Sequence, residues 1–255
     1  MKIIELTTTA QHDAVAELFQ RIWRAESPDQ LINAGMLQAF AHSGNYVVGA
    51  YEGDDLVGGA VAFLGAGHLH SHITGVVPGG QGHGIGYALK QHQRLWCLDR
   101  GIPEVRWTYD PLVRRNAYFN LQKLGARPTR YLPDFYGRMT DGVNAGDVSD
   151  RLYVTWRLGA PHVVAAANGE HPEPTVDGAV VMLDRDGEAP VTTGRTPGPR
   201  CLVALPLDIE ALRPADPRLT ARWRLAVRAA LTTSLSSGYA ITGATRDGYY
   251  LVERA

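Results

Sequence analysis

Apolar and polar positions follow two different periods along the first 158 residues. Between residues 11 and 24, apolar side chains recur at helical spacing, which predicts an amphipathic helix. The same reasoning predicts helices over about 29–42, 85–100 and 115–124. Shorter apolar runs predict strands over 3–6, 45–51, 56–64, 68–77, 105–109 and 151–158, the second and third joined as a hairpin by Glu52-Gly-Asp-Asp. The predicted order is therefore β-α-α-β-β-β-α-β-α-β.

Residues 159–200 have a different character, because prolines and glycines are scattered through them. We expect a connector here with one strand, over Gly178–Leu183. Residues 201–255 regain a pattern of short strands around a helical stripe formed by Leu219, Trp223, Val227 and Leu231. The sequence thus predicts three parts: residues 1–158, the connector 159–200 and a small α+β unit at 201–255.

Composition and charge narrow the classes of protein. The 255 residues are enough for a sizeable core, and the formal net charge of −1 provides no overall field for nucleic acid or an anionic membrane. Cys97 and Cys201 cannot form a disulfide framework, and their apolar surroundings indicate buried thiols in a reducing compartment. Because the chain has no long apolar run and no signal-peptide pattern, we expect a soluble, cytoplasmic protein.

The stretch Val-Val-Pro-Gly-Gly-Gln-Gly-His-Gly-Ile-Gly-Tyr-Ala-Leu-Lys, residues 76–90, is the most informative part of the chain. Its glycines lie between an apolar strand and a helical pattern, where exposed backbone N–H groups and a helix N-terminus suit a pyrophosphate. A Walker loop is excluded because no Lys-Ser or Lys-Thr follows, and a dinucleotide fingerprint does not fit because Asp99 comes too early. A glycine-rich hairpin without a ligand is the alternative interpretation.

Within this stretch, Gln81-Gly-His-Gly-Ile-Gly resembles the Gln/Arg-x-x-Gly-x-Gly/Ala signature of the GNAT superfamily of acyl-CoA-dependent acyltransferases. In that family the signature holds the coenzyme A pyrophosphate and follows the fourth strand. The resemblance implies an α/β (α+β) GNAT fold over residues 1–158, with a mixed, mostly antiparallel central sheet flanked by helices, and a small C-terminal α+β extension. It implies these cofactor-binding residues: Val76, Val77, Gln81, Gly82, His83, Gly84, Ile85, Gly86 and Asn116.

A second resemblance covers nearly the whole chain. The segment Arg106-Trp-Thr-Tyr-Asp-Pro-Leu-Val-Arg-Arg-Asn-Ala-Tyr-Phe-Asn-Leu-Gln-Lys-Leu-Gly-Ala, together with Trp223-Arg-Leu-Ala-Val-Arg, is similar to a GNAT subgroup of about this length that is linked with N-succinylamino acid racemases. This implies a transferase using acetyl-CoA or succinyl-CoA as co-substrate, a small-molecule amine such as an amino acid as acceptor, and no metal. A homodimer stays open, and a non-catalytic acyl-CoA-binding or regulatory protein is the alternative.

One residue departs from the family pattern. Many GNAT enzymes carry a Tyr three residues before the Leu of a Leu-Gly motif, where it protonates the departing thiolate, but here that position is Leu121. Tyr118 and Asn120 lie on the same predicted helix and are candidate substitutes for this acid, although they point to different faces. A core aromatic is the equal alternative for Tyr118.

The sequence also leaves more than one candidate for the general base. His68, His70 and His72 alternate along a predicted strand, so their side chains share one face but are spread too far apart to meet one metal ion easily. His70 or His72 is a candidate base near the acceptor pocket, and we assign His72. Half-exposed strand histidines without a catalytic role are the equal alternative. Asp110 is a further candidate, with a role in shaping the turn before Pro111 as the alternative.

Overall fold

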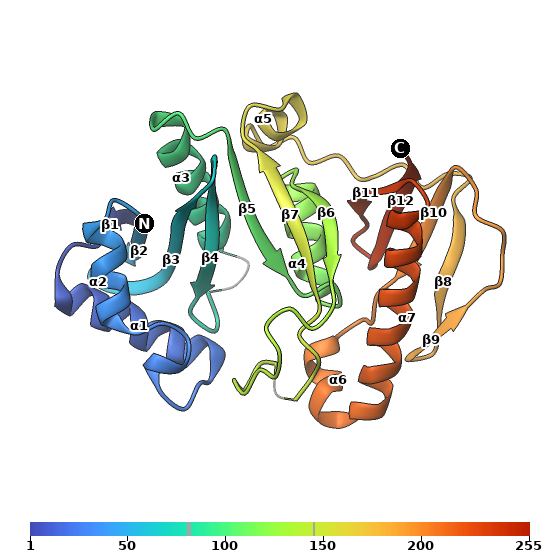
Figure 1. Ribbon diagram of the computed structural model, residues 1–255, viewed down its shortest axis with the longest axis horizontal. Helices are drawn as coiled ribbons and strands as arrows, with labels where there is room; N and C mark the ends of the chain where they lie inside the picture. The colour runs from blue at the N-terminus through green and yellow to red at the C-terminus, as the bar shows by residue number, and fades with distance from the viewer. Residues whose placement is uncertain (81–82, 145) are drawn as a thin grey trace. The chain divides into compact units, whose positions relative to one another are not determined.

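The computed structural model describes residues 1–80, 83–144 and 146–255. By its internal contacts the chain divides into two compact units (Figure 1). The first unit comprises Met1–Trp107 with Thr140–Val143, and the second comprises Thr108–Met139 with Asn144–Ala255. Each unit has its own strands, helices and buried core.

The first unit is built on a sheet with the strand order β1-β2-β3-β4-β5. Its elements are β1 (Lys2–Glu5), α1 (Thr9–Trp23), a short 3-10 helix (Pro28–Gln30), α2 (Ala34–His42), β2 (Tyr46–Glu52), β3 (Asp55–Gly65), β4 (His68–Val76), α3 (Ile85–Asp99) and β5 (Glu104–Tyr109), whose last two residues belong to the second unit. Neighbouring strands from β1 to β4 are antiparallel, and β5 is parallel to β4. The sheet is thus mixed and mostly antiparallel, which confirms what the resemblance to the GNAT superfamily implies.

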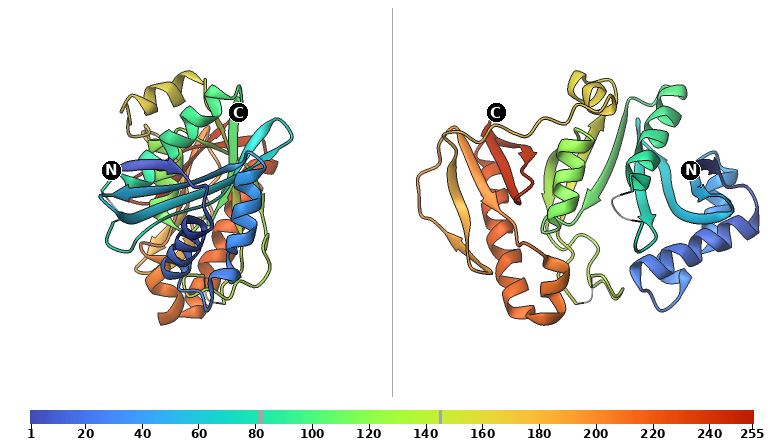
Figure 2. Two further views of the ribbon diagram at one scale, coloured as in Figure 1. Left: turned by 90° about the vertical axis from the view of Figure 1, so that its left-hand side faces the viewer. Right: turned by 180° about the vertical axis from the view of Figure 1, so that it is seen from behind.

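Two adjacent glycines in β3 show that α1 and α3 cover opposite faces of this sheet. A Cβ added at Gly59 would lie 2.5 Å from Val15 of α1, whereas a Cβ at Gly58 would lie 3.1 Å from Ile85 of α3. Because consecutive strand residues point to opposite faces, the two helices lie on opposite sides and approach the backbone closely. Figure 2, in the view from behind, shows α3 against the strands it contacts.

Helix α1 is fixed at its start and along its buried face. The Thr8 side chain accepts a hydrogen bond from the Gln11 backbone, and the Gln11 side chain accepts from the Thr8 N–H, a capping box. Along the helix, Val15, Leu18 and Phe19 are fully buried in the core on this side of the sheet. The helical spacing in the sequence therefore reports a real apolar face.

The second unit combines a pair of strands, a five-stranded sheet and several helices. Its elements are α4 (Arg114–Tyr118), a π-helical turn η2 (Phe119–Lys123), β6 (Arg127–Leu132), β7 (Arg151–Arg157), α5 (Pro161–Ala167), β8 (Val180–Asp186), β9 (Ala189–Thr192), β10 (Arg200–Ala204), α6 (Ile209–Ala215), α7 (Pro217–Ser236), β11 (Tyr239–Ala244) and β12 (Tyr249–Arg254). Strands β6 and β7 pair in antiparallel fashion. The second sheet has the order β11-β12-β10-β8-β9, and α7 packs along it through the buried Trp223 and Val227 (Figure 1).

The structure adds elements that the sequence did not predict. Strand β6, helix α5, strand β9 and helix α6 are new, so the 159–200 segment holds a helix and two strands where one strand was expected. The predicted helix over 29–42 is shorter, because α2 begins at Ala34. The predicted part boundaries at 158 and 200 stay predictions; along the chain, the division between the two compact units first falls at Trp107 and Thr108.

Two expectations from composition can be compared with the structure. Cys97 and Cys201 are both free and buried, which confirms their prediction as buried thiols. Within the part of the chain that the structure describes, no helix is both long and apolar enough to cross a membrane.

Candidate functional site

The glycine-rich segment leads from the end of β4 into the N-terminus of α3. Gly84 has φ of 82° and directly precedes the first helical residue, Ile85. A 15-residue helix follows, so the alternative of a simple hairpin is wrong. Of the predicted cofactor residues, Gln81 and Gly82 lie outside the described residues, while Val76, Val77, His83, Ile85 and Gly86 flank the N-terminus of α3.

This N-terminus has the geometry of an anion site. The first N–H groups of an α-helix have no acceptor within the helix and carry the positive end of its dipole. Among the described residues, a Cβ added at Gly86 would meet nothing closer than 3.8 Å, and one at Gly84 would meet nothing within 4 Å. The glycines therefore leave open space where a phosphate group can approach the backbone.

Strand β4 leaves its parallel partner soon after the two strands meet. The described pairing with β5 consists of Leu69 with Val105 and His70 with Arg106. From Ser71 onward, β4 runs toward the glycine segment without a further described pair to β5. On this stretch the Thr74 hydroxyl is buried and has no hydrogen-bond partner among the described residues. This unsatisfied buried hydroxyl lies on the stretch of β4 that has no described pairing with β5, where a ligand would supply the missing hydrogen bond.

The three histidines of β4 make different contacts, although His70 and His72 both lie beside the Phe63 ring. The ring of His68 contacts the Ala66 carbonyl at 3.0 Å, and His70 stacks on Phe63 with ring centroids 4.9 Å apart. Burial, together with His72, His68 and Lys90, lowers the pKa of His70 to about 4. In the described part of the chain, no group of three or more His, Cys, Asp or Glu side chains is arranged to hold a metal ion.

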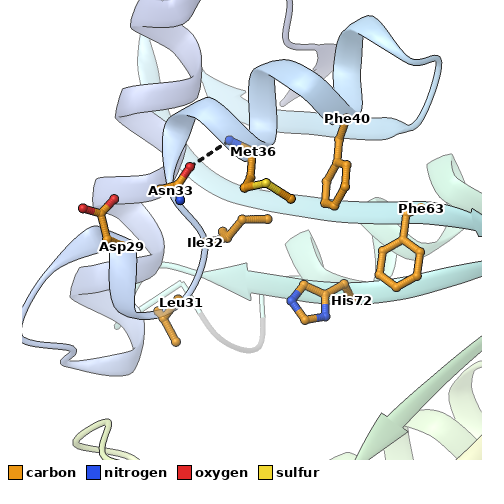
Figure 3. A pocket seen from close by; sticks show the side chains of 8 residues that line it. All are labelled: Asp29, Leu31, Ile32, Asn33, Met36, Phe40, Phe63 and His72. Atoms are coloured by element: carbon orange, nitrogen blue, oxygen red, sulfur yellow. Dashed lines mark hydrogen bonds between the residues drawn. The ribbon is translucent and has the colours of Figure 1, made fainter.

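A cavity of about 250 Å³ lies beside β4 on the side of α1 and α2. Its lining residues are Asp29, Leu31, Ile32, Asn33, Met36, Phe40, Phe63 and His72. Figure 3 shows the His72 ring between Leu31 and Phe63, with mostly apolar side chains around it. Partial burial lowers the pKa of His72, so the imidazole is neutral at pH 7 and can accept a proton. The cavity can thus take a small molecule beside a base.

Asp110 lies in a cluster of buried charges in the second unit. Its carboxylate accepts hydrogen bonds from Arg224 at 2.7 and 2.9 Å and from Arg213. Asp147 accepts from the same two arginines, at 2.5 Å from Arg224 and 3.1 Å from Arg213. Burial alone would raise the pKa of Asp110, but the guanidinium groups outweigh it and lower the pKa to about 2. Such a carboxylate is a very weak base, and its contacts favour a structural role.

The other candidates of the second unit lie on α4 and the π-helical turn. The Tyr118 hydroxyl donates to Glu173 at 2.8 Å and accepts from Arg246 at 3.1 Å. Burial and the bond to Glu173 raise the pKa of Tyr118. Asn120 is buried in the turn, and Asn116 is half-buried on α4. The hydroxyl of Tyr118 is therefore already engaged with charged side chains, and its role as an acid stays a prediction.

The structure also reveals a residue that the sequence did not single out. Lys90 of α3 is buried at 4% exposure, with its Nζ 2.8 Å from the Ser71 hydroxyl. The available signal was its place on the buried stripe of α3, together with Leu89 and Gln93.

Comparison with known proteins agrees with this architecture. Residues 12–125 match the model of the acetyltransferase (GNAT) family. No curated protein matches the sequence. Among solved structures, an aminoglycoside 6'-acetyltransferase type Ii is 20% identical, with a TM-score of 0.50, over 63% of this chain and 99% of its own.

Two further solved structures are similar. The ribosomal-protein-S18-alanine N-acetyltransferase from Escherichia coli is 16% identical, with a TM-score of 0.50, over 62% of this chain and 94% of its own. The protein yncA from Salmonella typhimurium, solved with its cofactor acetyl-CoA, is 18% identical, with a TM-score of 0.51, over 69% of this chain and 98% of its own. These likenesses define the fold as that of a GNAT acetyltransferase. The match to the acetyltransferase (GNAT) family model covers residues 12–125, less than half of the 255-residue chain.

Proposed function

We propose that this protein is an acyl-CoA-dependent N-acyltransferase that moves an acetyl group to the amine of a small molecule. The observation that carries the proposal is the passage from β4 through Gly84 into α3, which lies within the segment that matches the family. The open space at Gly84 and Gly86 and the unsatisfied Thr74 hydroxyl fit a ligand whose pyrophosphate lies at the helix and whose arm follows β4. Coenzyme A has this form.

In this proposal, different residues of the chain bind the cofactor and accept the proton. The N-terminus of α3, with His83, Gly84, Ile85 and Gly86, would hold the pyrophosphate, and β4 between Thr74 and Val76 would hold the arm. Bound acyl-CoA supplies a reactive thioester, so positioning provides much of the rate. His72 would accept the proton that the attacking amine loses, because it is neutral and lines the neighbouring cavity. Asp110, Tyr118, Asn120 and Asn116 have no role in this scheme.

The acceptor is proposed as a small amine, such as an amino acid with an apolar part. Support comes from the size and lining of the cavity, where Asp29 is the carboxylate available to an ammonium group. Two of the similar solved structures are an aminoglycoside acetyltransferase and an N-acetyltransferase for an alanine of a ribosomal protein, so the fold accommodates different acceptors. Transfer of succinyl in place of acetyl, a cytoplasmic location and a homodimer stay proposals.

A second candidate function is an acyl-CoA-binding protein without turnover. It is favoured by one observation, the leucine at position 121 where many relatives carry an acidic Tyr. Both functions need the same cofactor site, so they differ only in whether thiol is released.

The test is thiol release from acetyl-CoA and succinyl-CoA with a panel of small amines, combined with calorimetric titration of each acyl-CoA. Turnover with one acceptor supports the enzyme, and binding without turnover for every acceptor supports the binding protein. Gly84→Val should weaken binding by at least about tenfold, because Val resists the left-handed backbone of this position. Gly44→Val is the matched control, since Gly44 has a similar φ of 76° and lies in the turn between α2 and β2. Unchanged affinity in Gly84→Val would contradict the proposed site.

A further inference from the structure

Lys90 is a buried cation held by neutral groups. Its Nζ donates to the Ser71 hydroxyl at 2.8 Å and to the Gln93 side-chain oxygen at 3.2 Å, and it lies 4.1 Å from the centre of the Trp107 ring. Among the described residues, no carboxylate lies within ion-pair distance of it. Burial lowers the pKa of Lys90 to about 7, so the amine exchanges a proton readily near neutral pH.

This arrangement is costly for the fold. A buried ammonium without a counter-ion loses hydration that hydrogen bonds to neutral groups restore only in part. The Gln93 side-chain nitrogen is itself buried and has no partner among the described residues. A leucine or methionine at position 90 would pack on the same stripe without this cost, so the lysine is better explained by a chemical use.

The choice of lysine is itself informative. The chain has 25 Lys and Arg residues, and its lysines are Lys2, Lys90 and Lys123. An arginine keeps its proton at every physiological pH, whereas a buried lysine can give its proton away and regain it. In a chain whose basic residues are mostly arginines, this buried position holds a lysine, which can act as an acid.

Lys90 also lies where β4 and β5 part. The last described pair of the two strands is His70 with Arg106, and the next residue on each strand, Ser71 and Trp107, contacts the Lys90 ammonium. From Val76, beside the glycine loop, to Ser71 is five residues of strand, roughly 17 Å. The extended arm of coenzyme A between its pyrophosphate and its sulfur has a comparable length. An arm that follows β4 from the loop therefore ends near Lys90.

We propose that Lys90 is the acid that protonates the departing thiolate, in place of the Tyr that Leu121 replaces. The proposal rests on the proposed function. When the acceptor nitrogen has bonded to the acyl carbon, the carbon–sulfur bond breaks and its electron pair goes to sulfur. The proton on Lys90 Nζ moves to that sulfur and gives a free thiol. The neutral amine regains a proton from solvent, which receives the one lost by the acceptor through His72.

The groups around Lys90 are compatible with this cycle. Ser71 and Gln93 accept hydrogen bonds from it and fix its direction. The titratable neighbours are His70 on β4, which stays neutral because its pKa is about 4, and Cys97 on α3, whose pKa burial raises to about 12. Neither changes charge near pH 7, so Lys90 is the group of this cluster that titrates there.

Two measurements test the proposal. The first is an NMR titration of protein labelled with ¹³C at lysine Cε, in which the three lysines give few signals, with and without coenzyme A as the probe. The Lys90 signal should titrate near pH 7 and shift when coenzyme A is added, and Lys90→Met identifies it. If coenzyme A binds but leaves the Lys90 signal and its titration unchanged, Lys90 does not meet the sulfur and the proposal is overturned.

The second measurement is the pH profile of kcat with the acceptor found in the thiol-release panel. Lys90→Met should lower kcat by about 100-fold, at the low end for a general acid because thiolate leaves easily. It should also remove the fall of kcat above pH 7, while acetyl-CoA affinity stays within about threefold. Lys2→Met, an exposed lysine, is the control and should behave as the unchanged protein.

Lys90→Arg separates acid catalysis from simple charge. Arginine keeps the positive charge but does not give up its proton, so this variant should remain as slow as Lys90→Met. Recovery of kcat in Lys90→Arg, or an unchanged pH profile in Lys90→Met, would overturn the proposal. If Lys90→Arg does not fold, the profile of Lys90→Met and the NMR titration decide. Absence of any turnover in the unchanged protein would instead contradict the proposed function, and the NMR titration would still report whether Lys90 meets the thiol.

Discussion

The two units both bury charged side chains, but they do so in opposite ways. In the second unit, Arg213 and Arg224 face the carboxylates of Asp110 and Asp147, and every one of these contacts joins opposite charges. In the first unit, Lys90 is buried among a hydroxyl, an amide and an indole ring. Paired charges fix one protonation state and hold segments together, whereas burial without a counter-ion lowers the pKa of an amine toward neutral pH. The first arrangement serves the fold, and the second is suited to chemistry.

The largest expected effect comes from breaking the paired cluster. Arg224→Met leaves Asp147 and Asp110 buried with one guanidinium between them, and we expect a loss of about 3 to 5 kcal/mol in the free energy of unfolding. Arg222→Met on the same helix is the control, because Arg222 is exposed. Urea denaturation of both variants measures the difference. Equal stability of the two would show that the cluster is not a structural element.

A second prediction concerns Asp110 of the same cluster and the stability of the protein at low pH. The folded pKa of Asp110 is lowered from 3.8 to about 2, so the stability it contributes is present above pH 4 and is lost as the pH falls toward 2. The loss should be roughly 2 kcal/mol across this range. Urea midpoints between pH 2 and 5 should therefore depend less on pH in Asp110→Asn than in the unchanged protein. Parallel curves for the two proteins would contradict the ion pairing.

The sequence predicts the first unit well because its signals are local. Helix α1, the hairpin of β2 and β3, and the glycine loop before α3 each depend on residues within a short window, such as the helical spacing of Val15 and Phe19. The cofactor candidates from Val76 to Gly86 are what the resemblance to the GNAT superfamily implies, and they stay a prediction; Gln81 and Gly82 lie outside the described residues.

The missed features depend on distant residues or on misleading local ones. Asp110 and Arg224 are 114 positions apart, so no local pattern predicts their pairing. From the sequence alone, Asp110 is interpreted as a free carboxylate. Strand β6 contains Pro128, and α6 contains Pro214, which argue against a strand and a helix in a sequence. For Lys90 the local signal is only its place on the stripe of α3 with Leu89 and Gln93, and its contacts appear once α3 is placed on the sheet.

A third prediction removes the unpaired charge. Lys90→Met should raise the free energy of unfolding at pH 7 by roughly 1 to 2 kcal/mol, because the buried amine no longer has to be desolvated. The folded pKa of Lys90 is about 7 against 10.5 for a free side chain, so the unfolded chain binds more protons between these values. Stability of the unchanged protein should thus rise with pH from about 7 to 10.5, and this rise should be missing in Lys90→Met. If Lys90→Met is less stable than the unchanged protein, Lys90 contributes to the stability of the fold, as the paired arginines do.

The smallest effect is expected where an ion pair is exposed. Arg115 pairs with Glu210 in the second unit, but the Arg115 side chain is 64% exposed. Water and salt screen such a pair, so Arg115→Gln should change the free energy of unfolding by less than about 1 kcal/mol, and less still at high salt. The same denaturation series in low and high salt measures it. A loss as large as that of Arg224→Met would mean that burial is not what separates the charges of this chain. A small loss would show that an ion pair stabilises this chain according to its burial. The buried Arg224 cluster and the buried Lys90 then differ because the arginine has carboxylate partners and the lysine has neutral ones.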